Sequence, residues 1–225
     1  MKDIVVVLIF LLGVGVNAQA LEASLNLLQA LEKGTSQAII VREISKEDSQ
    51  AELTAWQKKD TGWELAQGPM PAVVGRNGLA ALNEKKEGDG KTPSGMFKIQ
   101  RAFGYERGVE TKLNYFQVDE NDFWVDDVDS PDYNRWVKEI KEGTRSFERL
   151  KRDDDLYKYA IVIEYNTDPV VPGNGSAIFL HIWRGAGSPT SGCVAVSKEN
   201  ILKLLEWLDT SQEPVVLIGQ QAVGP

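Results

Sequence analysis

Two short runs of β-branched and aromatic residues near the end of the chain constrain its fold most. Residues 157–165 read YKYAIVIEY and residues 176–183 read SAIFLHIW, and a stretch with Pro, Gly and Asn at 169–175 separates them. Runs of this composition, bounded by turn-forming residues, are typical of β-strands. We therefore predict a mainly β domain with these two strands at the centre of its sheet.

Weaker patterns predict the elements around these two strands. An amphipathic helix is expected at 21–33, where leucines recur at helical spacing before Gly34. A second helix should follow Ser197 as N-cap, because the apolar positions 201, 204, 205 and 208 lie on one helical face. Further strands are predicted at 37–43, 51–57, 63–66, 96–103, 115–118, 123–125 and 214–219.

Two stretches interrupt this regular pattern. Residues 68–95 are rich in glycine and proline, which predicts turns, with Lys91 and Ser94 shaping the last of them. Residues 104–155 are charged and weakly periodic, so we interpret them as a long excursion from the sheet. The aromatic residues of this excursion could line a groove as lid residues, although aromatics are more often core; they are Trp124, Tyr133 and Trp136.

The first twenty residues have the pattern of a secretory signal peptide. Lys2 precedes an apolar run from Ile4 to Val16, and Ala18-Gln19-Ala20 offers a cleavage site after Ala20. The run of about 13 residues is shorter than the roughly 20 that cross a bilayer as a permanent helix. We expect export to the periplasm or cell envelope with no stable membrane span after cleavage, and a retained anchor is the lesser alternative.

Composition narrows the possible chemistry. The formal net charge of −8 argues against a nucleic-acid partner, because phosphate binding needs a clustered cationic surface. The chain has one cysteine, Cys193, and one histidine, His181. An exported protein with a single cysteine forms no internal disulfide, so the thiol is buried and inert, paired between chains, or reactive. A reactive thiol needs a nearby base, and Gly192 would let its loop turn tightly and present backbone N–H groups to an oxyanion.

The acidic segments do not predict a metal site. Residues 126–130 and 153–155 carry clustered aspartates, but neither has the spaced oxygen ligands, central glycine and terminal glutamate of a calcium loop. Zinc would need carboxylates beside the single His and Cys, which is an uncommon ligand set. We predict no metal and no other cofactor.

The segment FLHIWRGAGSPTSGCVAV at 179–196 resembles the active-site segment of the YkuD-type L,D-transpeptidase family. The upstream stretch DGKTPSGMF at 89–97 is similar to a turn that enters a strand in the same family. The resemblance covers roughly residues 70–219. It implies a β-sandwich or barrel-like catalytic domain with a helix after Cys193, α+β overall. The expected organisation is a signal peptide at 1–20, an N-terminal helix and strands at 21–68, and the catalytic domain at 69–219 with its excursion at about 104–155.

The resemblance also implies the site residues. Cys193 would be the nucleophile and His181 the acid and base, while Ser191 and Gly192 would form the oxyanion loop and Thr190 would bind substrate. The chain departs from the commonest family pattern in two places, with Ser191 where a second histidine is usual and Ala195 where an arginine is usual. Arg184 is the nearest replacement for that arginine, although it could equally be a solvated loop residue.

Three functions remain open at this stage. The first is an L,D-transpeptidase, in which Cys193 attacks a tetrapeptide stem of peptidoglycan and an acceptor amine resolves the thioester. The second is an L,D-carboxypeptidase, in which water resolves it and the stem is trimmed. The third is a catalytically silent protein that binds peptidoglycan with the same fold.

Overall fold

The computed structural model describes residues 18–31, 34–45, 47 and 49–219 of the chain. Of the signal peptide predicted at 1–20, residues 1–17 lie outside this described part. The elements are α1 (Ala18–Gln29), β1 (Gln37–Ser45), β2 (Gln50–Lys59), β3 (Gly62–Val73), β4 (Gly95–Gly104), β5 (Asn114–Gln117), β6 (Phe123–Val125), β7 (Trp136–Val137), β8 (Phe147–Arg149), β9 (Tyr159–Ile163), β10 (Phe179–Ile182), β11 (Val194–Val196), α2 (Lys198–Trp207), a short 3₁₀ turn η1 (Thr210–Gln212) and β12 (Val215–Gly219).

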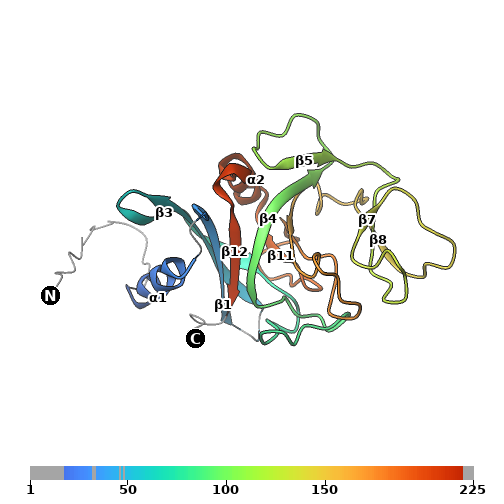
Figure 1. Ribbon diagram of the computed structural model, residues 1–225, viewed down its shortest axis with the longest axis horizontal. Helices are drawn as coiled ribbons and strands as arrows, with labels where there is room; N and C mark the ends of the chain where they lie inside the picture. Colours follow the sequence, from blue (N-terminus) through green and yellow to red (C-terminus); the bar gives the residue numbers. More distant parts are fainter. Residues whose placement is uncertain (1–17, 32–33, 46, 48, 220–225) are drawn as a thin grey trace.

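One large sheet closes on itself and forms the body of the protein. Its nine strands follow the order β12-β1-β2-β3-β11-β10-β9-β4-β5, and β12 also pairs with β4. Figure 1 shows the long strand β4 running beside β12 and on toward β5. The predicted mainly β, barrel-like fold is confirmed. The two strands predicted for the centre of the sheet, β9 and β10, pair with each other and each has a second neighbour in the sheet.

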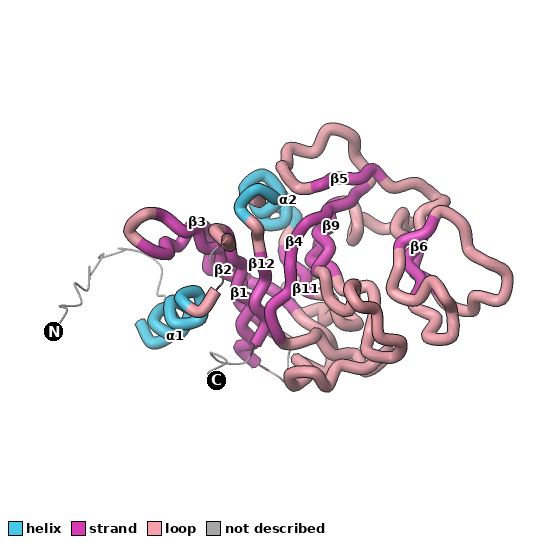
Figure 2. Tube along the Cα trace, in the orientation of Figure 1, coloured by secondary structure: helices cyan, strands magenta, loops and turns pink. Residues whose placement is uncertain are grey.

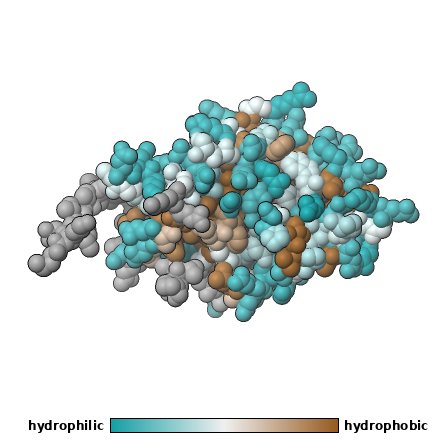
Figure 3. Space-filling model, in the orientation of Figure 1, coloured by the Kyte–Doolittle hydropathy of each residue, from teal (hydrophilic) through white to brown (hydrophobic). Residues whose placement is uncertain are grey.

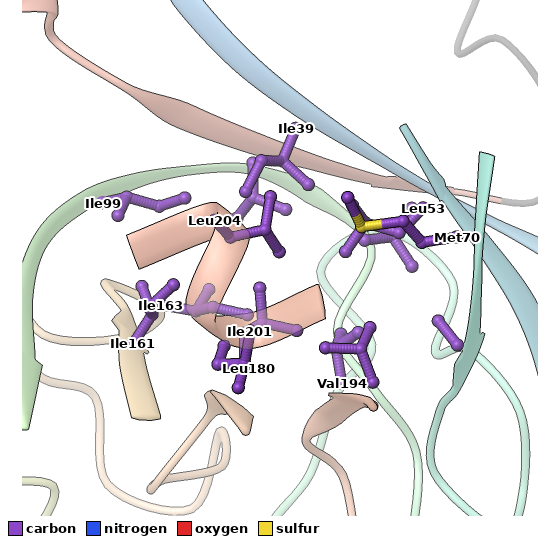
Figure 4. Close-up of a cluster of buried hydrophobic side chains, with 14 of the residues drawn as sticks. Ile39, Leu53, Met70, Ile99, Ile161, Ile163, Leu180, Val194, Ile201 and Leu204 are labelled. Atoms are coloured by element: carbon purple, nitrogen blue, oxygen red, sulfur yellow. The ribbon is translucent and has the colours of Figure 1, made fainter. Parts of the chain in front are cut away.

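The main core lies inside the closed sheet, where alternate residues of the strands meet the apolar face of α2. Figure 4 shows Ile39, Ile161 and Leu180 from three strands around Ile201 and Leu204 of α2. The prediction for this helix is confirmed, because Ser197 caps it by accepting a hydrogen bond from the Asn200 N–H. The predicted apolar face is also confirmed, since residues 201, 204, 205 and 208 are all buried.

A second core lies on the outer face of the sheet, under the predicted excursion. Figure 2 shows that the segment carrying β6 is mostly loop, and β6, β7 and β8 form a separate three-stranded sheet. Trp124 and Tyr133 are buried, and Trp136 packs against the same cluster from a half-buried position. The Trp124 indole N–H donates to Asn134 Oδ1 at 2.8 Å. These aromatics are therefore core residues of the excursion.

Strand β3 is longer than the predicted strand at 63–66, because it continues through Pro69 and Pro71 to Val73. The ladder with β2 shifts register where Thr54 faces the Gly68–Pro69 pair. A β-bulge of this kind leaves a residue outside the ladder, so a proline without an N–H is tolerated there. Gly68 has φ +102°, and a Cβ at this position would lie 2.8 Å from the Leu53 carbonyl oxygen.

Helix α1 spans Ala18–Gln29, so it begins and ends earlier than the helix predicted at 21–33, of which residues 32 and 33 lie outside the described part. The chain leaves the helix through a tight turn in which the N–H groups of Ala30 and Leu31 donate to carbonyls three residues earlier, at 3.2 Å. Leu31 nevertheless packs in the same cluster as Leu28. The leucine spacing thus reports which residues are buried and does not fix where the helix ends.

Helix α1 lies against the outer face of β1 and β12. An apolar cavity of about 290 Å³ lies beside this contact, and Leu27, Ile40 and Leu217 are among its lining residues. In the face drawn in Figure 3, hydrophobic side chains gather between α1 and the central strands, whereas the excursion is mostly hydrophilic. Within the described residues, no helix is both long and apolar enough to cross a membrane.

Replacing Leu204 by alanine tests the packing of α2. Leu204 is fully buried in the main core, so we expect Leu204→Ala to lower the free energy of unfolding by about 3 kcal/mol in urea titrations. Leu202 lies in the same helix but is 36% exposed, and Leu202→Ala should change it by no more than about 0.5 kcal/mol. Equal losses in the two variants would contradict the packing described here.

Candidate active site

The parallel pairing of β10 with β11 determines which side chains share the outer face of the sheet. Their Cα partners are Leu180 with Val194 and His181 with Ala195. Because side chains alternate along a strand, Leu180 and Val194 point into the main core while His181 points to the other face. Cys193 directly precedes Val194 and belongs to the outer core under the excursion. The only histidine and the only cysteine of the chain thus lie on the same face of neighbouring strands.

The Cys193 thiol is buried, with 7% of the residue exposed. Its Sγ accepts a hydrogen bond from the Phe179 N–H and donates one to the Ala177 carbonyl, both at 3.3 Å. Burial raises the pKa of the thiol to about 12, and the negative charge of Glu148 acts in the same direction. At neutral pH the resting thiol is therefore protonated.

His181 is neutral and held in one orientation. Its Nδ1 lies 2.8 Å from the Ile182 carbonyl oxygen. Because a carbonyl can only accept, Nδ1 carries the proton, and Nε2 keeps a free lone pair that can take a proton from a thiol. Burial lowers the pKa of the imidazole to about 4, with the residue only 6% exposed. The edge of the Tyr157 ring packs on this imidazole at a centroid distance of 5.1 Å.

Thr190 shapes the loop before Cys193. Its hydroxyl donates to the Cys193 carbonyl at 2.6 Å and accepts from the Gly192 N–H at 3.1 Å. The Gly192 N–H is therefore engaged in this structure, and an oxyanion role would require it to exchange this partner. Gly192 is needed for close approach, because a Cβ there would lie 3.1 Å from the Lys91 carbonyl oxygen.

The turn-rich segment at 68–95 holds this loop from the other side. The Thr92 hydroxyl accepts from the Gly75 N–H at 2.9 Å and donates to the Cys193 carbonyl at 3.2 Å. Thr190 forms backbone hydrogen bonds at 2.9 Å with Val74 and Arg76. The two sequence segments that carry the family resemblance are thus joined directly around Cys193.

Cys193 and His181 line one cavity of about 440 Å³. The excursion and the turn-rich segment supply much of its wall, and the wall carries both signs of charge. The charged lining residues are Arg76, Lys85, Glu87, Asp126, Glu148, Arg152 and Arg184. Among the described residues, no group of three or more His, Cys, Asp or Glu side chains could hold a metal ion.

Arg184 and Ser191 lie at the mouth of the cavity. The Arg184 side chain is 63% exposed, and its Nη2 lies 3.5 Å from Asp154 Oδ2. Ser191 is exposed, and its Oγ accepts a hydrogen bond from Arg76 Nη1 at 3.4 Å. Both arginines belong to the residues that line the cavity.

Three further residues of the cavity escaped the sequence analysis. Lys85 is buried, and its Nζ forms an ion pair with Asp89 at 2.8 Å. The Tyr157 hydroxyl donates to Glu148 Oε2 at 2.6 Å. Tyr157 belongs to a predicted strand, so its sequence position indicated only a role in packing. Lys85 and Glu148 lie in segments with no periodic signal. No pattern in the sequence places any of them beside Cys193.

Comparison with known proteins gives one family. The model of the L,D-transpeptidase catalytic domain, YkuD, matches residues 43–217, and this range contains every residue that lines the cavity. A solved structure, the helical cell shape determining protein Pgp2 from Campylobacter jejuni, matches with a TM-score of 0.40 and 17% sequence identity. The match covers 88% of this chain and 55% of that chain, so this chain spans about half of its length. No curated protein sequence matches significantly.

A proton NMR titration of the imidazole tests its burial directly, because the chain has one histidine. In the folded protein we expect the His181 ring signals to titrate with a midpoint near pH 4, and near the usual 6.5 once the protein is unfolded. A midpoint above pH 6 in the folded state would contradict a buried neutral imidazole.

The same shift makes stability depend on pH. A histidine whose pKa is lowered in the folded state contributes its full share to the free energy of unfolding above pH 6.5. This contribution is lost as the pH falls toward 4, because the unfolded state binds the proton at a higher pH than the folded state does. Relative to His181→Gln, the unfolding free energy of the parent protein should fall by roughly 3 kcal/mol across that window. Parallel curves for the two proteins would contradict this assignment.

Proposed function

Because the chain belongs to the L,D-transpeptidase catalytic domain family, we propose that it is an exported cysteine acyltransferase that acts on peptidoglycan stem peptides through Cys193 and His181. Membership of the family indicates an L,D-transpeptidase-type activity on peptidoglycan. The observation that carries the proposal is that the only thiol and the only imidazole of the chain face one cavity from neighbouring strands.

In the first half of the reaction, His181 acts as a general base. Its Nε2 takes the thiol proton as the Cys193 sulfur attacks the carbonyl carbon of the third residue, an L-configured centre, in a tetrapeptide stem. The bond to the terminal D-alanine then breaks, and the imidazolium returns the proton to the departing amine. The product is a thioester between Cys193 and the shortened stem. A neutral thiol and a neutral imidazole suit this order of steps, because the thiol proton moves only when the substrate accepts the electron pair of the sulfur.

In the second half, an amine from a second stem attacks the thioester, and His181 takes its proton. The new amide bond is a cross-link, and the thiol is restored when the imidazolium gives up its proton. If water attacks instead, a trimmed tripeptide is released and the enzyme is an L,D-carboxypeptidase. The two reactions share the same acyl-enzyme and differ only in the nucleophile that reaches it.

A carboxylate of the donor stem needs a cationic partner. Since Ala195 occupies the place of the usual family arginine, another residue has to supply the positive charge. We assign this role to Arg184, which lines the cavity and keeps most of its side chain exposed. Arg76 lies across the mouth beside Ser191 and could share the same carboxylate. Thr190 acts on substrate through the shape of its loop, since its hydroxyl is occupied by the backbone of residues 192 and 193.

The proposed place of action is the periplasm or cell envelope, where the stem peptides are. The support for export is the apolar run from Ile4 to Val16 followed by Ala18-Gln19-Ala20. A family that acts on peptidoglycan is consistent with this location.

Intact-mass spectrometry tests the nucleophile. After incubation with disaccharide-tetrapeptide, or with a carbapenem as acyl donor, the parent protein should gain the mass of the acyl group and Cys193→Ala should gain nothing. His181→Gln should acylate about a hundredfold more slowly, because the general base is lost. Cross-linked and trimmed muropeptides in the same reactions distinguish transpeptidation from hydrolysis. Unchanged tetrapeptide without any adduct would refute the enzymatic function and leave a protein that only binds peptidoglycan.

Steady-state kinetics test the carboxylate site. Loss of a charge-assisted hydrogen bond predicts that Arg184→Ala raises KM about tenfold while kcat changes little. Arg107→Ala is the matched control, because Arg107 pairs with Gln117 in the excursion, away from the cavity. If Arg184→Ala and Arg107→Ala behave alike, the carboxylate is held by another residue.

A further inference from the structure

Tyr157 is in contact with both proposed reacting residues. Its ring meets the His181 imidazole edge-on at 5.1 Å and the Phe179 ring at 5.5 Å. The residue belongs to the same buried cluster as Cys193 and lines the same cavity. Its hydroxyl also lowers the pKa of the Cys193 thiol, although the hydroxyl proton itself is donated to Glu148 in this structure. Tyr157 therefore packs against the imidazole and also acts on the thiol from within the same buried cluster.

The hydroxyl is anchored on its other side by Glu148. The Tyr157 oxygen lies 2.6 Å from Glu148 Oε2. Glu148 lies in β8 and is paired with Trp124 of β6. Burial raises the pKa of the Glu148 carboxyl, and the nearby Asp126 acts in the same direction. These two effects favour the protonated form of Glu148, whereas the hydrogen bond from Tyr157 favours the ionised form.

The protonation state of Glu148 decides where the single hydroxyl proton of Tyr157 can go. If Glu148 is ionised, the Tyr157 proton is held by the carboxylate, and a negative charge stands near the sulfur. If Glu148 is protonated, its own O–H can donate to the Tyr157 oxygen. The Tyr157 proton is then free to donate to the sulfur.

We propose that Tyr157 is a catalytic residue that stabilises the developing Cys193 thiolate by donating a hydrogen bond to Sγ, with Glu148 as the positioning residue that holds the hydroxyl. The thiol proton still moves to His181 Nε2, while Tyr157 and Glu148 each keep their own protons. The inference rests on the proposed nucleophilic role of Cys193. It adds a stabilising donor that the family resemblance did not supply.

Other charged groups also act on this cluster and enter any pH profile. Besides Glu148, the groups that influence Tyr157, Cys193 or His181 electrostatically are Lys85, Arg152, Asp154 and Arg184. Glu87 and Asp126 act on Glu148. Because Tyr157→Phe and Glu148→Gln leave all of these residues in place, differences between the pH profiles report the hydroxyl and the carboxyl themselves.

The test is the rate of alkylation of Cys193 by iodoacetamide, followed by intact mass from pH 6 to 10. This readout needs no peptidoglycan, so it can fail independently of the proposed function. Tyr157→Phe keeps the ring and its contacts, and we expect alkylation at pH 8 to slow about tenfold and the profile to move to higher pH. Tyr115→Phe is the matched control, because its hydroxyl bonds to the Glu106 carbonyl, away from the cavity. An unchanged rate and profile in Tyr157→Phe would overturn the proposal.

Variants of Glu148 keep the proposal testable if Tyr157→Phe does not fold. Glu148→Gln retains a side chain that can donate to the Tyr157 oxygen and cannot become negatively charged. The pH profile of Cys193 alkylation should therefore move to lower pH in this variant. Glu148→Ala leaves the hydroxyl without an anchor, and alkylation should slow severalfold. If the two variants alkylate at equal rates, Glu148 does not act by holding Tyr157. In acylation assays, Tyr157→Phe should lower kcat more than it raises KM, as expected for an interaction that forms in the transition state.

Discussion

Backbone hydrogen bonds between the parallel strands β10 and β11 hold Cys193 and His181 on one face of a closed sheet, and the rest of the site is built around that register. A shift by one residue would turn one of the two side chains into the main core. The closed sheet resists such a shift, because Leu180 and Val194 on the other face are buried in the main core, which also contains Ile201 and Leu204 of α2. Packing inside the sheet thus fixes the geometry outside it.

Burial has the second decisive effect. It lowers the pKa of His181 and raises that of Cys193, so the pair rests as a neutral imidazole and a neutral thiol. The excursion contributes to this burial, since its residues Val118, Trp124 and Leu150 belong to the outer core together with Cys193. It also delivers Glu148 and Arg152 to the wall of the cavity. A segment with little regular structure of its own therefore contributes to the electrostatics of the site.

The sequence predicted the elements whose pattern is local. The strands at β6, β9 and β10 and the helix after Ser197 follow from composition, alternation and capping, and the structure has all of them. Strands β7, β8 and β11 were not predicted, because they have two or three residues each and no period can emerge over so short a run. Strand β6 is equally short, and only its composition, Phe-Trp-Val, indicated it. The true length of β3 was hidden because a bulge admits Pro69, and a proline in sequence alone indicates a break.

The sequence by itself determined that the chain is mainly β, that its active-site candidates are Cys193 and His181, and that both lie in a segment resembling one family. Only the tertiary structure decided which residues surround them. Lys85, Glu148 and Tyr157 come from three separate stretches of the chain, and they converge because the sheet closes and the excursion folds back over its outer face. The pKa values of the pair were likewise out of reach of the sequence, because they depend on how much water the folded chain excludes.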